Sequence, residues 1–257
     1  MPEIYAQSID EAWLRAVDAA RRLHKREVSP LTVAFDVGEP APTHLQCPGL
    51  RARLDEALVA GGNATVETVA NTLFPKSLWN PSKPREHLFQ RYQKILPTLR
   101  HVGNPRGLYF ERMISYPGTR GTVGKNQLDH IAQTFVSGNH RRSALQAAIF
   151  YPPADLNHSR QLGFPCLHQV AFTHSHARGT LTVTAFYAMQ YLFERAYGNY
   201  LGLMRLGQFM SHEMNLKLER VICIAAVAKL EVAANLVEPL LSQFLTHSKI
   251  GNARRSA

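Results

Sequence analysis

The residue best suited to covalent chemistry in this sequence is Cys166, which follows Pro165 at the head of an apolar run. A cysteine thiolate is a strong nucleophile, and nearby cations favour the thiolate over the neutral thiol. Two adjacent arginines, Arg141 and Arg142, precede the cysteine and lead into a strand expected over residues 143–150. Asn199 follows it with an amide that presents a donor and an acceptor side by side. A buried cysteine is also commonly a small hydrophobic core residue, and that alternative stays open.

The segments around these residues have the pattern of strands and helices that alternate along the chain. Residues 180–187 alternate in character as a strand does, and residues 221–227 form a continuous apolar run typical of a buried strand. Between them, apolar residues recur at helical spacing over residues 201–214. We therefore expect Cys166 at the head of a strand and Asn199 just before a helix-forming run.

This order of residues and elements resembles the catalytic half of the thymidylate synthase family. In that family a Pro-Cys pair supplies the thiolate that adds to C6 of a pyrimidine ring, and a later asparagine hydrogen-bonds the ring edge. The resemblance places these two roles on Cys166 and Asn199. It also places on Arg141 and Arg142 the paired arginines that reach across a dimer to the partner's phosphate. The resemblance covers about the last half of the chain well and the first half loosely.

The resemblance also implies a fold. It predicts the α/β (α+β) class, with a thymidylate synthase-like single domain over residues 1–257 and a mixed β-sheet flanked by helices. Two subunits would pack sheet against sheet as a homodimer. We expect residues 248–257 to be a frayed tail. The composition agrees, because 257 residues with 45% hydrophobic and 19% charged residues are typical of one sizeable globular domain.

Three further residues take positions that matter in the family. Glu67, in a helix expected to begin at Thr65, would manage protons on the pyrimidine; alternatively it is a first-turn acid favoured by the helix dipole. Tyr109 takes the place of a tyrosine beside the catalytic thiol, or else is an ordinary core aromatic. The family's histidine directly after the cysteine is Leu167 here, and His168 lies one position further on.

Other positions depart from the family pattern. Ala188 and Met189 replace an Arg-Ser pair that holds the phosphate in the same subunit, and Tyr191 replaces the aspartate that meets folate. Lys229 and Glu231 replace the residues that touch the sugar. No counterpart of the tail that closes over folate is recognised. The resemblance therefore implies a retained scaffold with an altered substrate shell. 5,10-methylenetetrahydrofolate is a candidate carbon donor that we expect to bind weakly or not at all.

The chemistry explains why these residue types would occur together. Carbon C5 of a pyrimidine is a poor nucleophile, and addition of a thiolate to C6 converts the ring to an enolate that can attack a one-carbon electrophile. The amide of Asn199 matches the O4 and N3–H edge of uracil, whereas cytosine inverts that pattern.

Two classes of function follow from this chemistry. One is an enzyme that methylates or hydroxymethylates C5 of a uracil-type nucleotide or nucleoside, including a non-standard substrate in modified-nucleoside biosynthesis. The alternative is a nucleotide-binding or interaction protein that keeps the scaffold without catalysis.

Charge and the first residues bear on partners and location. The net charge of +10 favours an anionic partner such as a nucleotide, a nucleic acid or an anionic membrane, unless the basic surface serves solubility alone. With the resemblance, we expect a pyrimidine nucleotide or nucleoside, no nucleic acid and no membrane. The N-terminus lacks the regions of a signal peptide, and no apolar run is long enough to span a bilayer. We expect the protein in the cytoplasm.

The cysteines and histidines suggest neither disulfides nor a metal. The three cysteines, Cys47, Cys166 and Cys223, are an odd set without repeated spacing. His174 and His176 alternate on an expected hairpin, where a metal would need a third ligand from elsewhere. We therefore expect no metal.

Overall fold

The computed structural model describes residues 2–37, 47, 49–102, 104–118, 124–138, 140–156, 158 and 164–253, with side chains up to residue 245. The described strands are β1 (Glu3–Ala6), β2 (Glu27–Val28), β3 (Leu31–Asp36), β4 (Gln146–Ala148), β5 (Leu167–Ser175), β6 (Thr180–Tyr191) and β7 (Lys217–Lys229). The described α-helices are α1 (Ile9–Arg21), α2 (Leu50–Ala60), α3 (Val66–Leu73), α4 (Arg85–His101), α5 (Tyr109–Ile114), α6 (Gln127–Val136), α7 (Pro152–Asp155), α8 (Tyr197–Glu213) and α9 (Ala234–Ala253).

These strands form one mixed sheet. Its order is β1-β3-β7-β6-β5-β4, and β2 pairs with β7 beside this path. The pairs β1–β3 and β6–β7 are parallel, whereas β3–β7, β5–β6, β4–β5 and β2–β7 are antiparallel. Helices flank the sheet, so the α/β class expected from the sequence is confirmed.

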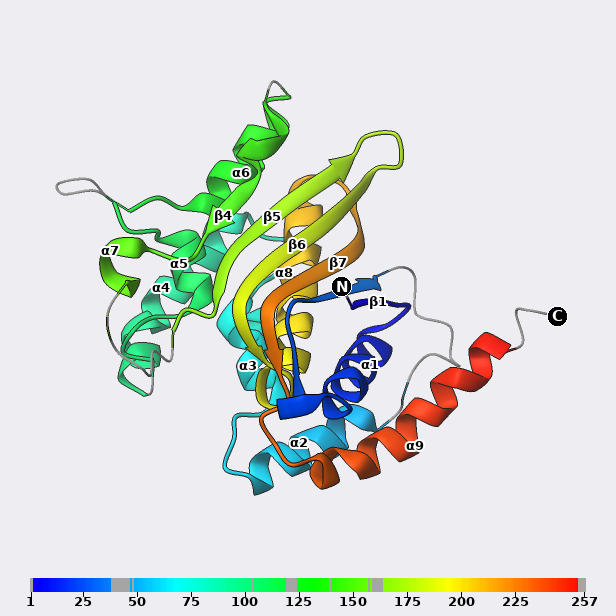
Figure 1. Ribbon diagram of the computed structural model, residues 1–257. Helices are drawn as coiled ribbons and strands as arrows, with labels where there is room; N and C mark the ends of the chain where they lie inside the picture. Colours follow the sequence, from blue (N-terminus) through cyan, green and yellow to red (C-terminus); the bar gives the residue numbers. More distant parts are fainter. Residues whose placement is uncertain are drawn as a thin grey trace.

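The two faces of the sheet differ. On β6, Leu181, Val183, Ala185 and Tyr187 are fully buried, while the intervening side chains are not, and Phe186 is 40% exposed. Strand side chains alternate between faces, so the buried set faces the helices. Helix α8 packs against β6 and β7, and Figure 1 shows α8 and α3 behind the sheet with no described helix in front of β5, β6 and β7. One sheet face is therefore covered, and the other is open.

Helix α3 packs closely against α8 because two glycines of α8 face it. A Cβ on Gly198 would lie 2.5 Å from Val69 Cβ, and a Cβ on Gly202 would lie 2.7 Å from Leu73 Cβ. Such distances are far inside van der Waals contact, so only glycine fits at these positions. The consequence is that α3 is held at a fixed place beside the first turns of α8.

The structure differs from the sequence-based expectation around the paired arginines. A strand was expected over residues 143–150, but β4 spans only Gln146–Ala148, and a 3₁₀ turn occupies Arg142–Ala144. The strand is short because only Gln146, Ala147 and Ala148 pair with residues of β5. Strand alternation therefore does not fix the directions of Arg141 and Arg142.

The end of the chain is helical further than expected. Helix α9 includes Pro239 and runs to Ala253, packing against α1 and α2. Residues 254–257 of the expected frayed tail lie outside the described residues. No helix in the described part of the chain is long and apolar enough to cross a membrane.

Candidate active site

Residues from four separate segments line one cavity of about 720 Å³ beside Cys166. Its walls come from α3, from the loop that leads into α5, from the residues just before β5, and from the end of β6 together with the start of α8. Cys166, Tyr109 and Asn199 all line it. Three residues that the sequence singled out separately are therefore brought together.

Cys166 occupies the position directly before β5. Its carbonyl accepts a hydrogen bond from the backbone N–H of Ala188 at 3.0 Å, which fixes it against β6. Burial raises the pKa of the Cys166 thiol, and the positive charge of Arg195 acts in the opposite direction. The neutral thiol is thus the resting form at neutral pH, and its ionisation depends on nearby charge.

Tyr109 begins α5 and packs against the residues around the thiol. Its ring lies 5.2 Å from the ring of Phe164, centroid to centroid, in a tilted arrangement. The backbone of Cys166 and of Leu167 lies close to the Tyr109 hydroxyl and acts to lower the pKa of Tyr109. Burial nevertheless raises that pKa, so the hydroxyl stays protonated and can donate a hydrogen bond.

Asn199 lies in the first turn of α8 and is 5% exposed. Its side chain lines the cavity, and no described residue makes a hydrogen bond with its amide. A buried amide costs free energy unless its donor and acceptor are satisfied. The side chain is therefore available to a ligand that offers an acceptor and a donor side by side.

A π-helical turn, Leu192–Ala196, joins β6 to α8 and brings Glu194 and Arg195 to the cavity. The sequence-based reasoning did not single out either residue. Arg195 precedes Asn199 by four positions, the spacing that puts two side chains on one helix face, and this signal could have indicated it. Turns of this kind occur frequently at functional sites.

Glu231 holds this turn from behind. Its carboxylate accepts hydrogen bonds from the backbone N–H of Glu194 at 2.6 Å and of Phe193 at 3.4 Å. Burial raises the pKa of Glu231, while these backbone donors lower it. Glu231 therefore anchors the turn that carries Arg195, whereas the resemblance implied a sugar contact at its position.

Arg106 reaches the cavity from the loop before α5. The loop is closed by hydrogen bonds from Gly107 N–H to the Asn104 carbonyl at 3.0 Å and from Asn104 Nδ2 to the Leu99 carbonyl at 3.1 Å. Among the described residues, neither Arg106 nor Arg195 has an ion-pair partner. The described lining thus holds two arginines against one carboxylate, that of Glu194.

Glu67 lies outside the described lining of this cavity. Arg205 donates to both of its carboxylate oxygens at 2.7 and 2.9 Å, and Arg51 donates to one of them at 2.7 Å. These hydrogen bonds, that of Arg205 foremost, lower the pKa of Glu67 to about 2. The face of α3 that reaches the cavity carries Val69 and Thr72 instead. This placement favours the structural alternative for Glu67.

His168, Arg141 and Arg142 also lie outside the described lining. His168, on β5, stacks on Phe150 with ring centroids 4.6 Å apart, and burial lowers its pKa. Arg141 and Arg142 are exposed at the 3₁₀ turn before β4. The cavity is therefore built without these three residues in the single chain.

The histidines of the expected hairpin gather elsewhere. The ring of His174 lies 4.3 Å from that of His176 and 5.8 Å from that of His140, with Phe135 against all three. Burial lowers the pKa of His174. Within the ranges that the structure describes, no group of three or more His, Cys, Asp or Glu residues could hold a metal ion.

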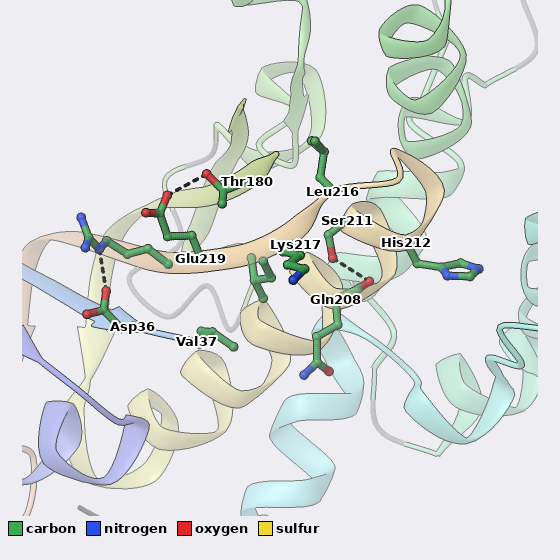
Figure 2. A pocket seen from close by; sticks show the side chains of 11 residues that line it. Asp36, Val37, Thr180, Gln208, Ser211, His212, Leu216, Lys217 and Glu219 are labelled. Carbon is green, nitrogen blue, oxygen red and sulfur yellow. Dashed lines mark hydrogen bonds and ion pairs between the residues drawn. The ribbon is translucent and has the colours of Figure 1, made fainter. Parts of the chain in front are cut away.

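A second cavity, of about 800 Å³, lies at the outer ends of β3, β6 and β7, beside the last turn of α8 (Figure 2). Two of its charged groups pair with each other, Arg220 with Asp36 at 2.9 Å, and Glu219 accepts a hydrogen bond from the Thr180 hydroxyl at 2.9 Å. Its described lining contains no cysteine. The cavity beside Cys166 is therefore the candidate active site.

No model of a protein family matches the chain, and no curated protein matches it. The function is therefore inferred from the residues and geometry of the cavity.

Proposed function

We propose that the protein is a thymidylate synthase-like enzyme that uses the Cys166 thiolate to activate C5 of a uracil-type pyrimidine nucleotide or nucleoside for one-carbon transfer. One observation carries this proposal: Cys166, Tyr109 and Asn199 line the same cavity, although they lie far apart in sequence. A cavity of about 720 Å³ is of the size that holds a small-molecule ligand.

The proposed reaction starts with addition of the Cys166 thiolate to the pyrimidine ring. The thiolate sulfur bonds to C6, and the electron pair of the C5–C6 double bond moves toward the O4 carbonyl to give an enolate. C5 then bonds to a one-carbon electrophile, loses its proton, and elimination restores the ring and the thiolate. Among the described lining residues, Glu194 is the carboxylate available to accept that proton. A formaldehyde-level electrophile gives a hydroxymethyl group, while a methyl group requires a two-electron reductant in addition.

Asn199 and Tyr109 have distinct parts in this proposal. The Asn199 amide hydrogen-bonds O4 and N3–H, which favours uracil and stabilises the enolate oxygen as charge develops there. The Tyr109 hydroxyl, protonated and beside the backbone of Cys166, donates to the reacting ring or its water.

The residues present do not fit folate in the way that the resemblance implies. The position that would meet the pterin ring holds Tyr191, which lines the cavity and carries no carboxylate. The carbon donor is therefore a one-carbon electrophile at the oxidation level of formaldehyde, and no role falls to folate.

We further propose that two copies pack through the open sheet face. A row of side chains crosses that face through paired positions, from Phe186 on β6 to Ile224 on β7 and Thr32 on β3. The row is largely uncharged, as a sheet-to-sheet interface requires. Sedimentation of a monomer at micromolar concentration would contradict the dimer.

The direct test of the enzymatic proposal is release of tritium from C5-tritiated uridine or UMP, because only thiolate addition labilises that position. Cys166→Ala should abolish the release. Cys47→Ala is the matched control, since Cys47 lies outside the described cavity lining and burial raises its pKa to about 11. Tritium release by Cys166→Ala at the wild-type rate would overturn the mechanism.

The second candidate is a nucleotide-binding protein without catalysis. The burial of Cys166 favours it, because burial raises the pKa of the thiol and so favours the neutral form over the thiolate. In that case UMP would bind through Asn199, with no tritium release by the wild-type protein.

A further inference from the structure

We propose that Arg195 is the cation that stabilises the Cys166 thiolate, and that the Glu231 carboxylate positions it by holding the π-helical turn. The inference depends on the proposed function only in taking Cys166 as a nucleophile.

Arg195 lies in the same cavity as the Cys166 thiol. Arg195 and Cys166 line one cavity, and the charge of Arg195 acts on the ionisation of both Cys166 and Tyr109. Arg106, the other described arginine of the lining, is not among the charges that act on Cys166. Arg195 is therefore distinguished from Arg106 by its proximity to the thiol.

The guanidinium of Arg195 is available to an anion in the cavity. Arginines elsewhere in the described chain are commonly bound by carboxylates, as Arg205 is by Glu67 and Arg112 by Asp155. Arg195 has no such partner among the described residues, although Glu194 is its neighbour in sequence. A guanidinium without a bound carboxylate keeps its charge for a developing anion, here the sulfur.

The backbone that carries Arg195 is held in place by neighbouring residues. A long exposed side chain activates a thiol only if its backbone is fixed relative to the sulfur. Glu231 fixes the turn through Phe193 and Glu194, the two residues directly before Arg195. On the other side, Gly198 locks the start of α8 against Val69. The turn is thus held at both ends, and Glu231 is a positioning residue.

The step at issue is a proton transfer alone. The thiol loses its proton to solvent, the sulfur becomes negative, and the positive charge of Arg195 stabilises it; no bond to carbon forms. The step can therefore be measured without substrate, by the reaction of the sulfur with iodoacetamide, because the thiolate is the reactive species.

The experiment is the pH profile of Cys166 alkylation, followed by mass spectrometry of the peptide that contains Cys166. Arg195→Gln should move the profile to higher pH and slow alkylation at pH 8 by about three- to tenfold, the range for removing one partly screened charge. Arg195→Lys should restore most of the rate. Glu231→Gln should move the profile in the same direction by less.

Arg106→Gln is the matched control, since it removes an exposed arginine of the same cavity and should leave the Cys166 profile in place. Superposition of the Arg195→Gln and wild-type profiles would overturn the proposal, as would an equal shift in Arg106→Gln. Failure of the proposed function looks different: the profiles would shift as expected, yet no tritium would leave C5 of uridine or UMP.

Discussion

Two arginines on one continuous segment of chain have opposite surroundings. Arg205, on α8, binds both oxygens of Glu67, and its side chain is 13% exposed. Arg195, on the preceding π-helical turn, is exposed at the cavity without an ion-pair partner among the described residues. Helix α3 makes the difference, because it presents Glu67 to Arg205 but only the uncharged Val69 and Thr72 to the cavity. An arginine that is paired with a carboxylate stabilises the fold, whereas the charge of an unpaired arginine remains available to a reacting group.

The contact between α3 and α8 underlies both regions, so disturbing it should have the largest effect. Gly198→Ala would place a Cβ 2.5 Å from Val69 Cβ, and overpacking of this kind costs about 1–3 kcal/mol. We expect the free energy of unfolding, measured by urea denaturation, to fall by that amount.

Gly61→Ala provides the control for this prediction. A Cβ there would meet the flexible Asn63 side chain at 3.2 Å, so a much smaller change is expected. Equal stability of Gly198→Ala and wild type would show that α3 can move away from α8 at little cost.

Exchanging each arginine for glutamine sharpens the comparison. Arg205→Gln should lower the free energy of unfolding by roughly 1 kcal/mol, because it breaks a bidentate ion pair in which the Arg205 side chain is 13% exposed and that of Glu67 is 43% exposed. Arg195→Gln should change it by less than about 0.5 kcal/mol, as surface substitutions usually do. Thermal denaturation of the two variants tests this, and a destabilisation of Arg195→Gln equal to that of Arg205→Gln would mean that Arg195 is structural too.

The Glu67 ion pairs also predict a pH dependence, whose size solvent screening reduces because the Glu67 side chain is 43% exposed. The folded pKa of about 2 lies below the ordinary value of 4.5, so the unfolded chain binds more protons between these values. The stabilisation is therefore complete above about pH 4.5 and is lost as pH falls toward 2. Urea denaturation at several pH values should show this loss in the wild type and a weaker dependence in Glu67→Gln. Parallel curves for the two proteins would contradict it.

Local features of this protein could be predicted from its sequence. The helix expected to begin at Thr65 does so: the Thr65 hydroxyl accepts a hydrogen bond from Thr68 N–H, and α3 ends where Phe74 and Pro75 follow. Cys166 lies directly before a strand, and Asn199 lies at the start of a helix, as the apolar periodicity indicated. Such signals lie within a few residues of the element that they define, so a single sequence contains them.

Features that depend on distant partners could not be predicted. Glu67 meets Arg205 across 138 positions of sequence, and no local pattern indicates that pairing. Likewise, the turn that carries Arg195 depends on Glu231, whose contacts to it span 37 and 38 positions. The sequence singled out Cys166 and Asn199, whereas the charges around them follow from tertiary packing.

The π-helical turn also lies between two elements, β6 and α8, whose positions are fixed by different neighbours. Strand β6 is fixed by its pairing with β7 as far as Tyr191 opposite Lys229, and α8 is fixed by Gly198 against α3. A π-helical turn holds one residue more per hydrogen-bonded loop than an α-helical turn does, so it can absorb a gain or loss of one residue between these fixed points. A change in chain length here would alter which side chains face Cys166 while leaving both β6 and α8 in place. The chemistry of this site can therefore evolve by insertion or deletion as well as by substitution.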